Sequence, residues 1–325
     1  MSRRAPKGMT IPGKANPMAG KRRGLKVDGW VILDKPVGMT STQAVGAVRR
    51  VFQAAKAGHG GTLDPLATGL LPIALGEATK TVPYVMDGMK TYRFTLRFGE
   101  ARATDDAEGE ISATSDVRPE DEAIRAGLPA FCGRIQQRPP IYSALKLAGQ
   151  RAYDLARAGE PVDLAPREIL IQRFELIERP DADHAVFEVL SGKGAYMRSL
   201  ARDLAEALGT VGHVAALRRI AVGPFTEAHA ISLDSLQALG HIPAASRHLL
   251  PVATALDDIP ALAVTDSEAS RLRCGQSVGP IRRQDLERIG HFGSGAVFCA
   301  KSGGLPVALV RLEAGDLRPV RVLNL

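Results

Sequence analysis

The sequence predicts an α+β protein with two domains. The chain has 325 residues, of which 45% are hydrophobic, and a chain of that length can bury a large core and usually divides. Before residue 250, some segments space apolar residues as helices do and others alternate them as strands do. Beyond residue 250, short strand-like runs are separated by Gly, Pro and acidic turns. These later runs predict a compact β-barrel.

Apolar patterns define the elements of the first hundred residues. Residues 30–33 are a short apolar run that predicts a strand. Residues 40–43 (TSTQ) form a capping box for a helix, whose apolar residues continue at helical spacing to Phe52. Residues 70–75 predict a buried strand. A further strand is expected over residues 92–98, because Tyr, Phe and Leu alternate there with Arg and Thr.

The middle of the chain is more polar. Residues 104–110 (TDDAEGE) are acidic, but their spacing does not match a calcium-binding EF-hand loop, so we expect a hairpin connection. Pro119 and the acids after it predict the first turn of a helix. Pro139-Pro140 excludes a regular helix over residues 134–147. The other elements expected here are a helix over residues 151–158 and strands over 168–177 and 185–190.

A helix is also predicted after residue 196. Leu200, Leu204 and Leu208 recur every four residues, so one face of this helix is expected in the core, and Gly209 should end it. Residues 230–256 are expected to form a helical connector with Ser232 as its N-cap. The second domain would follow this connector.

Composition restricts the partners. The formal charge is +7 and the isoelectric point is near 9.5, which favours an anionic partner such as nucleic acid or a membrane surface. No apolar segment approaches the roughly 20 residues that a spanning helix needs, so nucleic acid is the better candidate. The three cysteines are far apart and indicate neither a disulfide framework nor a zinc site, which fits a reducing cytoplasm. The basic residues among 1–26 are typical of a flexible arm that touches phosphates or of a solvated tail.

One stretch, residues 56–71 (KAGHGGTLDPLATGLL), holds the best candidate for chemistry. It places a carboxylate, Asp64, between a glycine-rich loop and an apolar run, and Pro65 limits Asp64 to extended conformations. An apolar environment can tune the reactivity of such an acid, which suits a nucleophile. The same residues would also form an ordinary turn. Local sequence alone leaves both interpretations open.

A series of motifs in a fixed order decides between the nucleophile and the ordinary turn. Residues 58–59 (GH), 61–65 (GTLDP) and 67–69 (ATG) closely resemble the catalytic block of the TruB family of tRNA pseudouridine synthases. Residues 33–41 (LDKPVGMTS) resemble the opening motif of that family, and later matches extend through most of the chain. One departure is Gly60, where the family more often has Thr.

The resemblance implies a fold and an activity. The fold would be that of pseudouridine synthases: a central mixed, mainly antiparallel sheet flanked by helices, followed by a small PUA-like β-barrel. The activity would be isomerisation of uridine-55 in the T loop of tRNA to pseudouridine, on a flipped-out base and without cofactor or metal. The partner would be the T-arm stem-loop of tRNA. We expect a cytoplasmic monomer with no obligate protein partner.

The resemblance also assigns roles to individual residues. Asp64 would be the nucleophile, attacking either C1′ or C6 of the uridine. Arg198, in the motif GxYxRSL, would pair with it, because an arginine beside a carboxylate favours the charged form and aims it. Tyr92 would stack on the base and accept a proton in later steps. The residues expected to bind substrate are His59, Tyr196, Leu217, Lys35 and Lys146.

The expected layout has three parts. Residues 1–26 would be the flexible basic arm. Residues 27–250 would be the catalytic domain, with an inserted RNA-clamping segment at about 131–160. Residues 251–325 would form the PUA-like RNA-binding domain.

Two other functions fit parts of the sequence. A non-catalytic tRNA-binding or tRNA-folding protein could keep the same scaffold, but binding alone would not need Asp64, Tyr92 and Arg198 together. A glycoside hydrolase would need a second acid at a defined distance from Asp64, and no candidate stands out. The synthase is therefore the leading hypothesis.

Overall fold

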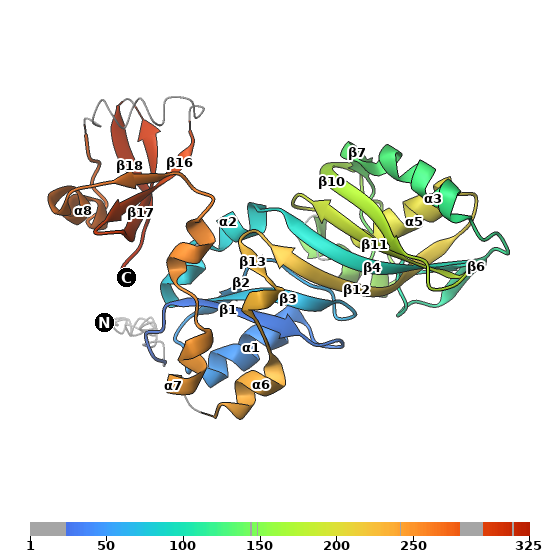
Figure 1. The fold of residues 1–325 in the computed structure, drawn as a ribbon, viewed down its shortest axis with the longest axis horizontal. Helices are drawn as coiled ribbons and strands as arrows, with labels where there is room; N and C mark the ends of the chain where they lie inside the picture. The colour runs from blue at the N-terminus through green and yellow to red at the C-terminus, as the bar shows by residue number, and fades with distance from the viewer. Residues whose placement is uncertain (1–23, 144, 148, 241, 280–294, 314) are drawn as a thin grey trace, which may run out of the picture.

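The computed structural model describes residues 24–143, 145–147, 149–240, 242–279, 295–313 and 315–325 (Figure 1). They form a large body built on a ten-stranded sheet and a small C-terminal domain built on a four-stranded sheet. The basic arm expected over residues 1–26 lies outside the described residues as far as residue 23. Within the described ranges, no helix is long and apolar enough to cross a membrane.

The large sheet is mixed and mainly antiparallel, as the resemblance implied. Its main path follows the order β14-β1-β3-β12-β4-β11-β10-β7, in which the pairs β14–β1 and β3–β12 are parallel and the others antiparallel. Two short strands join it at the side, β2 (Ala57–His59) on β3 and β13 (Phe225–Thr226) on β12. The strands of the main path are β1 (Gly29–Lys35), β3 (Thr68–Leu75), β4 (Lys90–Phe98), β7 (Gly133–Gln137), β10 (Arg167–Glu178), β11 (His184–Ser191), β12 (Gly212–Val222) and β14 (Ala230–Ser232).

Helices cover both faces of this sheet. The helices and 3₁₀ turns of the body are α1 (Ser41–Val51), η1 (Gly76–Lys80), α2 (Val82–Asp87), α3 (Asp121–Gly127), η2 (Leu128–Phe131), α5 (Met197–Ala207), η3 (Glu227–His229), α6 (Leu233–Ala238), α7 (Ile242–Ala245), η4 (Ser246–His248) and η5 (Val252–Leu256). The largest core cluster joins α1, α3, α5 and α6 to one face, where the rings of Phe94 and Phe187 lie 5.3 Å apart. On the other face, α2 and η5 pack around Trp30 and Phe225. Alternate residues of β1 therefore divide between two cores.

Helix ends agree with the sequence signals. The Thr40 hydroxyl accepts from the Gln43 N–H, and the Gln43 side chain accepts from the Thr40 N–H, which confirms the capping box of α1. The Ser232 hydroxyl caps α6 in the same way. After α5, Gly209 adopts a φ of +74°, a conformation that favours glycine and ends the helix.

Three strands of the main path are not predicted by sequence pattern. β7 (GRIQQ) is polar because it is an edge strand with mostly exposed side chains. β12 is central, but buried Arg219 interrupts its apolar alternation. β14 opens the segment 230–256, which is therefore not helical throughout. Chain topology, not local pattern, places these strands.

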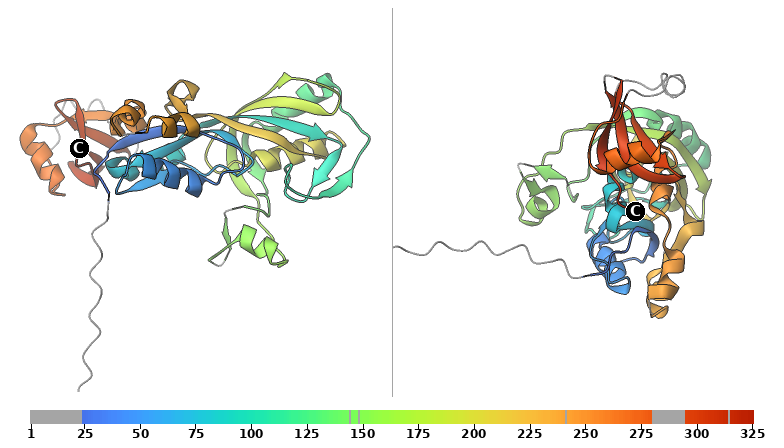
Figure 2. Two further views of the ribbon diagram at one scale, coloured as in Figure 1. Left: turned by 90° about the horizontal axis from the view of Figure 1, so that it is seen from below. Right: turned by 90° about the vertical axis from the view of Figure 1, so that its left-hand side faces the viewer.

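A small unit projects from the body between β7 and β10. It contains β8 (Lys146–Leu147), β9 (Gln150–Arg151) and α4 (Ala152–Arg157), drawn in light green in Figure 2, and α4 confirms the helix predicted over 151–158. The inserted segment was expected from about residue 131, but β7 belongs to the large sheet, so the projecting part starts at Arg138. It leaves and rejoins the sheet at one place, because Gln137 of β7 pairs with Arg167 of β10.

Residues 104–110 form a hairpin connection, as expected. They join β5 (Glu100–Arg102) to β6 (Ile111–Thr114), which pair antiparallel. The connection folds back onto the large sheet, where the Val214 N–H donates to the Asp105 carbonyl at 3.0 Å. This fold-back brings its acidic residues close to α5.

The C-terminal domain is a sheet of order β15-β16-β17-β18 with one helix among its described residues. Its elements are β15 (Ala261–Ala263), α8 (Asp266–Arg273), β16 (Val297–Ser302), β17 (Leu305–Glu313) and β18 (Asp316–Val322). The strand-like runs predicted from sequence over residues 262–264, 295–300, 307–312 and 317–323 are confirmed as strands, and α8 is an addition. The described residues show a small sheet rather than a closed barrel.

This domain packs against the body near α2. The contact is a buried apolar cluster that includes Tyr84 of α2. Its buried members are Leu256, Cys299, Leu309 and Leu323. Since η5 still packs with Trp30 in the body, the change from one domain to the other lies after Leu256 rather than at residue 250.

The last residues of the chain return to the body beside η1. The Lys80 ammonium donates to the carbonyl of Val322 at 2.8 Å, and the Asn324 N–H donates to the Glu77 carboxylate at 2.8 Å. Glu77 and Lys80 also pair with each other at 2.7 Å. The C-terminus therefore connects the small domain to the turn that follows β3.

Candidate active site

The loop that carries Asp64 joins β2 to β3. Gly60 donates its N–H to the carbonyl of Pro72 at 2.8 Å, and a Cβ at this position would stand 2.7 Å from a methyl group of Val85 in α2. Gly61 has a φ of +130°, which favours glycine. The departure from the TruB pattern at residue 60 therefore lets the loop pack closely on α2.

Lys35 supports this loop from beneath. Its side chain is fully buried, and its ammonium donates to the carbonyl oxygens of Pro36, Met39 and Pro65 at 2.9, 2.8 and 3.3 Å. Burial lowers the pKa of Lys35 to about 8, while the nearby Asp64 carboxylate opposes the shift. The expectation that Lys35 contacts substrate is thus corrected: all three donors of the ammonium serve the backbone around Asp64.

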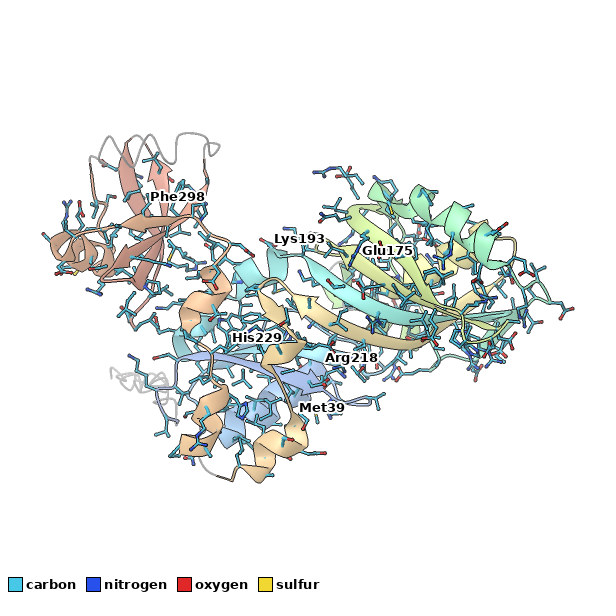
Figure 3. The ribbon with its side chains drawn as sticks, in the orientation of Figure 1. Met39, Glu175, Lys193, Arg218, His229 and Phe298 are labelled. Atoms are coloured by element: carbon cyan, nitrogen blue, oxygen red, sulfur yellow. The ribbon has the colours of Figure 1, made fainter. Side chains whose placement is uncertain are left out.

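Arg219 holds the loop from the side of β12. Its side chain is 1% exposed and donates to the carbonyl oxygens of Leu70, Gly61 and Thr62 at 2.8, 3.1 and 3.3 Å. The preceding residue, Arg218, labelled in Figure 3, pairs elsewhere, with both carboxylate oxygens of Asp34 at 2.9 Å. Of these adjacent arginines, it is Arg219 that faces the candidate site.

Asp64 and Arg198 form the ion pair that the resemblance implied. The distance between Nη2 of Arg198 and Oδ2 of Asp64 is 2.9 Å, and the Arg198 side chain is 5% exposed against 37% for Asp64. Two further hydrogen bonds of 2.9 Å run from the guanidinium to the carbonyls of Thr104 and Tyr142, and the carboxylate of Asp106 lies 3.4 Å away. The cation is therefore held in place, while the acid keeps an accessible face.

A pocket of about 530 Å³ opens beside this pair, and we call it the first pocket. Asp64, Tyr92, Tyr196 and Leu217 all line it, so the structure brings these predicted residues together from four separate segments. Burial raises the pKa of the Tyr196 phenol, which stays protonated at neutral pH. An acid at the edge of a pocket walled by aromatic and apolar side chains is suited to a flat ring.

Tyr196 is positioned by a residue that sequence reasoning missed. Gln137 of β7, only 2% exposed, accepts from the Tyr196 N–H at 2.8 Å and donates to the Tyr196 carbonyl at 3.0 Å. Both ends of one amide side chain thus fix the backbone at the start of α5. Because Arg198 follows two residues later, Gln137 also fixes the backbone from which the Arg198 side chain extends to Asp64.

A second pocket, of about 630 Å³, lies on the other side of Asp64 and Arg198. It is lined by His59 and by Tyr142, Tyr153 and Arg157 near or within the projecting unit. Burial lowers the pKa of His59, and the charge of Arg219 adds to this, so its ring is neutral at physiological pH. The Arg157 guanidinium lies 4.4 Å above the ring of Tyr153. Neutral and stacked rings in a groove are typical of single-stranded nucleic-acid sites.

The structure does not test the expected contact of Lys146 with substrate or the expected absence of a metal. Lys146 lies in β8 of the projecting unit, but its side chain lies outside what the structure describes. Across the described ranges, no group of three His, Cys, Asp or Glu side chains is arranged to hold a metal ion.

Comparison with known proteins identifies the family. Residues 49–197 match the model of the TruB family pseudouridylate synthase N-terminal domain, and residues 198–257 match that of the tRNA pseudouridylate synthase B C-terminal domain. A tRNA pseudouridine synthase B of Gluconacetobacter diazotrophicus is 59% identical over 309 residues, or 93% of this chain and 99% of that protein. The chain belongs to the TruB family. It is therefore a pseudouridine synthase. A TruB relative of the same name from Rhodospirillum rubrum is 55% identical over 95% of this chain and 100% of its own.

Solved structures extend the likeness of this TruB chain to its fold. A Cbf5-Nop10-Gar1 complex matches with a TM-score of 0.69 and 27% identity, covering 90% of this chain and 83% of that chain. An H/ACA RNP bound to a substrate RNA containing 2′-deoxyuridine matches with a TM-score of 0.68 and 23% identity, covering 95% of this chain and 91% of that chain. These matches confirm the predicted fold.

Three residues of the TruB site were not singled out by sequence. Asp106 was assigned only to a hairpin connection, Gln137 to a polar segment, and Arg219 to no role. Each acts through a residue at least 59 positions away in the chain, as in the contact between Gln137 and Tyr196. A buried arginine in a strand is the one local signal that could have pointed to the site, because charged residues are rarely buried unless they are paired.

Proposed function

We propose that this chain converts uridine-55 in the T loop of tRNA to pseudouridine, with Asp64 as the nucleophile. The observation that carries the proposal is the Asp64–Arg198 pair at 2.9 Å, placed where a pocket of about 530 Å³ meets Tyr92 and Tyr196. The names of the relatives, tRNA pseudouridine synthase B, support tRNA as the substrate. The acid stands at an entrance that an extruded base can reach.

The two pockets bind different parts of the substrate. The uracil ring enters the first pocket, stacks on Tyr92 and packs against Leu217, while the RNA backbone stays in the second pocket beside His59. Extrusion costs a few kcal/mol of unstacking, which stacking on the tyrosine offsets. Arg198 aims Asp64 at the nucleotide, and Tyr92 accepts the proton that a later step releases. Such a reaction joins the same atoms in a new order, so its chemistry balances without an outside reagent.

The rest of the molecule would hold the tRNA. The projecting unit would close over the T arm, with Lys146 contacting phosphate. The small C-terminal sheet would act as a PUA-like domain on the acceptor side. We propose that the protein acts as a cytoplasmic monomer and that its positive charge of +7 strengthens tRNA binding at low salt.

The test compares wild type and Asp64→Asn on an unmodified tRNA transcript, with chelator present and with binding measured in parallel. We expect wild type to form pseudouridine at position 55, and Asp64→Asn to bind the transcript with similar affinity but to form none. Product at another uridine would contradict the site assignment. If neither protein forms product while both bind tightly, a tRNA-binding or tRNA-folding protein on the same scaffold takes the place of the synthase.

A further inference from the structure

The charged residues of the first pocket do not balance. Its lining includes four cations and two carboxylates. Arg198 pairs with Asp64 at 2.9 Å, and Lys193, labelled in Figure 3, pairs with Asp87 at 2.9 Å. The two cations that remain are Lys90 and Arg219. Neither has a carboxylate within 4.0 Å among the described residues, although they are 6% and 1% exposed.

Both cations keep donors that the protein does not use. The Lys90 ammonium donates to the carbonyls of Met86 and Gly88 at the end of α2, which leaves one of its three N–H groups. The Arg219 guanidinium donates once each from Nε, Nη1 and Nη2, which leaves two of its five N–H groups. Buried cations normally have anionic partners. Lys90 and Arg219 line a pocket but have no such anionic partner among the described residues. We infer that the anion comes with the ligand.

The position of the two cations matches that of the base. Arg219 of β12 is paired directly with Tyr92 of β4, and Lys90 lies two residues before Tyr92 on the same strand. Residues two apart on a strand share a face. The unused cations therefore flank the tyrosine on which the extruded ring would stack, deep in the pocket, whereas the phosphates remain with the RNA chain outside.

Uracil carries no charge when it enters, but it gains one during the reaction. When Asp64 attacks C1′, a bond forms between its oxygen and C1′, the C1′–N1 bond breaks, and the electron pair stays on the ring. The uracil leaves as an anion whose charge is shared by N1, O2 and O4. When C5 then bonds to C1′, the carboxylate is released, C5 loses its proton and N1 gains one. Attack at C6 would also place negative charge on the ring oxygens.

We propose that Lys90 and Arg219 stabilise the detached uracil as its anion, by donating their unused N–H groups to the ring oxygens. The inference rests on the proposed function. Because the charge exists only after the reaction begins, these contacts strengthen in the transition state and raise the rate rather than the affinity. Lys90 is the residue to test, since Arg219 also holds the Asp64 loop.

The test uses two T-arm RNAs, with uridine or 5-fluorouridine at position 55, in single-turnover reactions that follow loss of the original nucleoside. Fluorine withdraws electrons and makes the ring a better anion. We expect Lys90→Met to slow the loss of uridine about 100-fold, the scale of a lost oxyanion donor. The loss of 5-fluorouridine should slow by a clearly smaller factor, because that ring needs less stabilisation. In Lys90→Arg, the ratio of the rates for the two RNAs should be close to the ratio in wild type.

Lys193→Met is the matched control, because it removes a cation from the exposed rim of the same pocket. It should lower both rates by one common factor. Equal factors for the two RNAs in Lys90→Met would overturn the proposal and leave Lys90 as a phosphate contact or a cap of α2. A wild-type protein that consumes neither RNA would instead refute the proposed function, so the two failures are distinguishable.

A pH profile keeps the inference testable if Lys90→Met does not fold. The groups that face Lys90 are Arg219 from β12, Asp87 from α2 and Lys193 from the segment before α5. Burial, with a further contribution from Arg219, lowers the pKa of Lys90 to about 8. The wild-type kcat/KM should therefore fall above pH 8 as the ammonium loses its proton. Lys90→Arg, which shares any titration of the RNA and of Lys35, whose pKa is also about 8, should show a smaller fall, and identical profiles would contradict the proposal.

Discussion

Arg198 makes more contacts than its pair with Asp64 requires. Its buried guanidinium donates to the carbonyls of Thr104 and Tyr142 and lies 3.4 Å from Asp106. A buried cation is stable where several partners share it, and the partners here come from two separate segments, the connection 104–110 and the residues around Tyr142. The direction in which Arg198 presents Asp64 to the first pocket therefore depends on residues that lie outside that pocket.

At this scale we predict the effect of Asp106→Asn. The variant keeps the size of the side chain but removes the negative charge near Arg198, so the ion pair should shift. A shift of about 1 Å can lower a rate on the order of 100-fold. We therefore expect the chemical step to slow by about 10-fold to 100-fold, with little change in tRNA affinity. Single-turnover pseudouridine formation measures this. Asp105→Asn is the control, because Asp105 pairs with Arg202 at 2.8 Å, and an equal loss in both variants would argue against a specific role for Asp106.

Among the elements, the Asp64 loop and α2 depend on each other. The loop passes so close to α2 that a Cβ at Gly60 would stand 2.7 Å from Val85, and Val85 is 1% exposed. A short, β-branched side chain cannot rotate out of the way. The small residue at position 60 and the valine at position 85 are therefore a matched pair.

The matching prediction is that Gly60→Thr destabilises the protein and that Val85→Ala in the same chain reverses part of the loss. Overpacking of this kind costs about 1–3 kcal/mol. Thermal and chemical unfolding measure it. Gly58→Ala serves as control, because nothing lies within 4 Å of a Cβ there. If Gly60→Thr were as stable as wild type, the loop would have to move, and the packing argument would be wrong.

The whole molecule is two domains whose contact includes the end of the chain. Glu77 follows directly after β3, and it accepts from the Asn324 N–H and from Lys80. Burial acts to raise the pKa of Glu77, but these two donors outweigh it and hold the pKa below its usual value. A depressed pKa gives stability that is present above the unfolded value, about 4.3, and is lost as the pH falls through the folded value.

We therefore predict that acid loosens this docking. At pH 6 the Asn324 amide should exchange its hydrogen more slowly in wild type than in Glu77→Gln. As the pH falls through the lowered pKa of folded Glu77 the two rates should converge, because Glu77 is then protonated in the folded state as well as in the unfolded state. Hydrogen exchange of the C-terminal peptide, compared between the variants at each pH, measures this. Equal rates at pH 6 would show that the carboxylate does not hold the tail.

Much of this architecture could be predicted from sequence where local pattern and tertiary structure agree. The capping box at Thr40, the alternation in β4 and the leucine spacing in α5 all predict the observed elements. β12 escaped prediction because a strand that carries Arg219 into a pocket loses its apolar period. Lys35 was wrongly assigned to the substrate because nothing in its neighbours shows that three carbonyls surround it. Asp106 and Gln137 depend on contacts between distant segments, which no local pattern records.

The pairing of Gln137 with Arg167 has a consequence for evolution and engineering. Everything from Arg138 to Pro166 is inserted at a point where two neighbouring strands already lie side by side. A short turn between the same two residues would leave the register of the sheet unchanged. The outer part of this insertion could therefore be shortened, or replaced by a segment of foreign origin, without moving the strands, provided that the carbonyl of Tyr142 keeps its contact with Arg198.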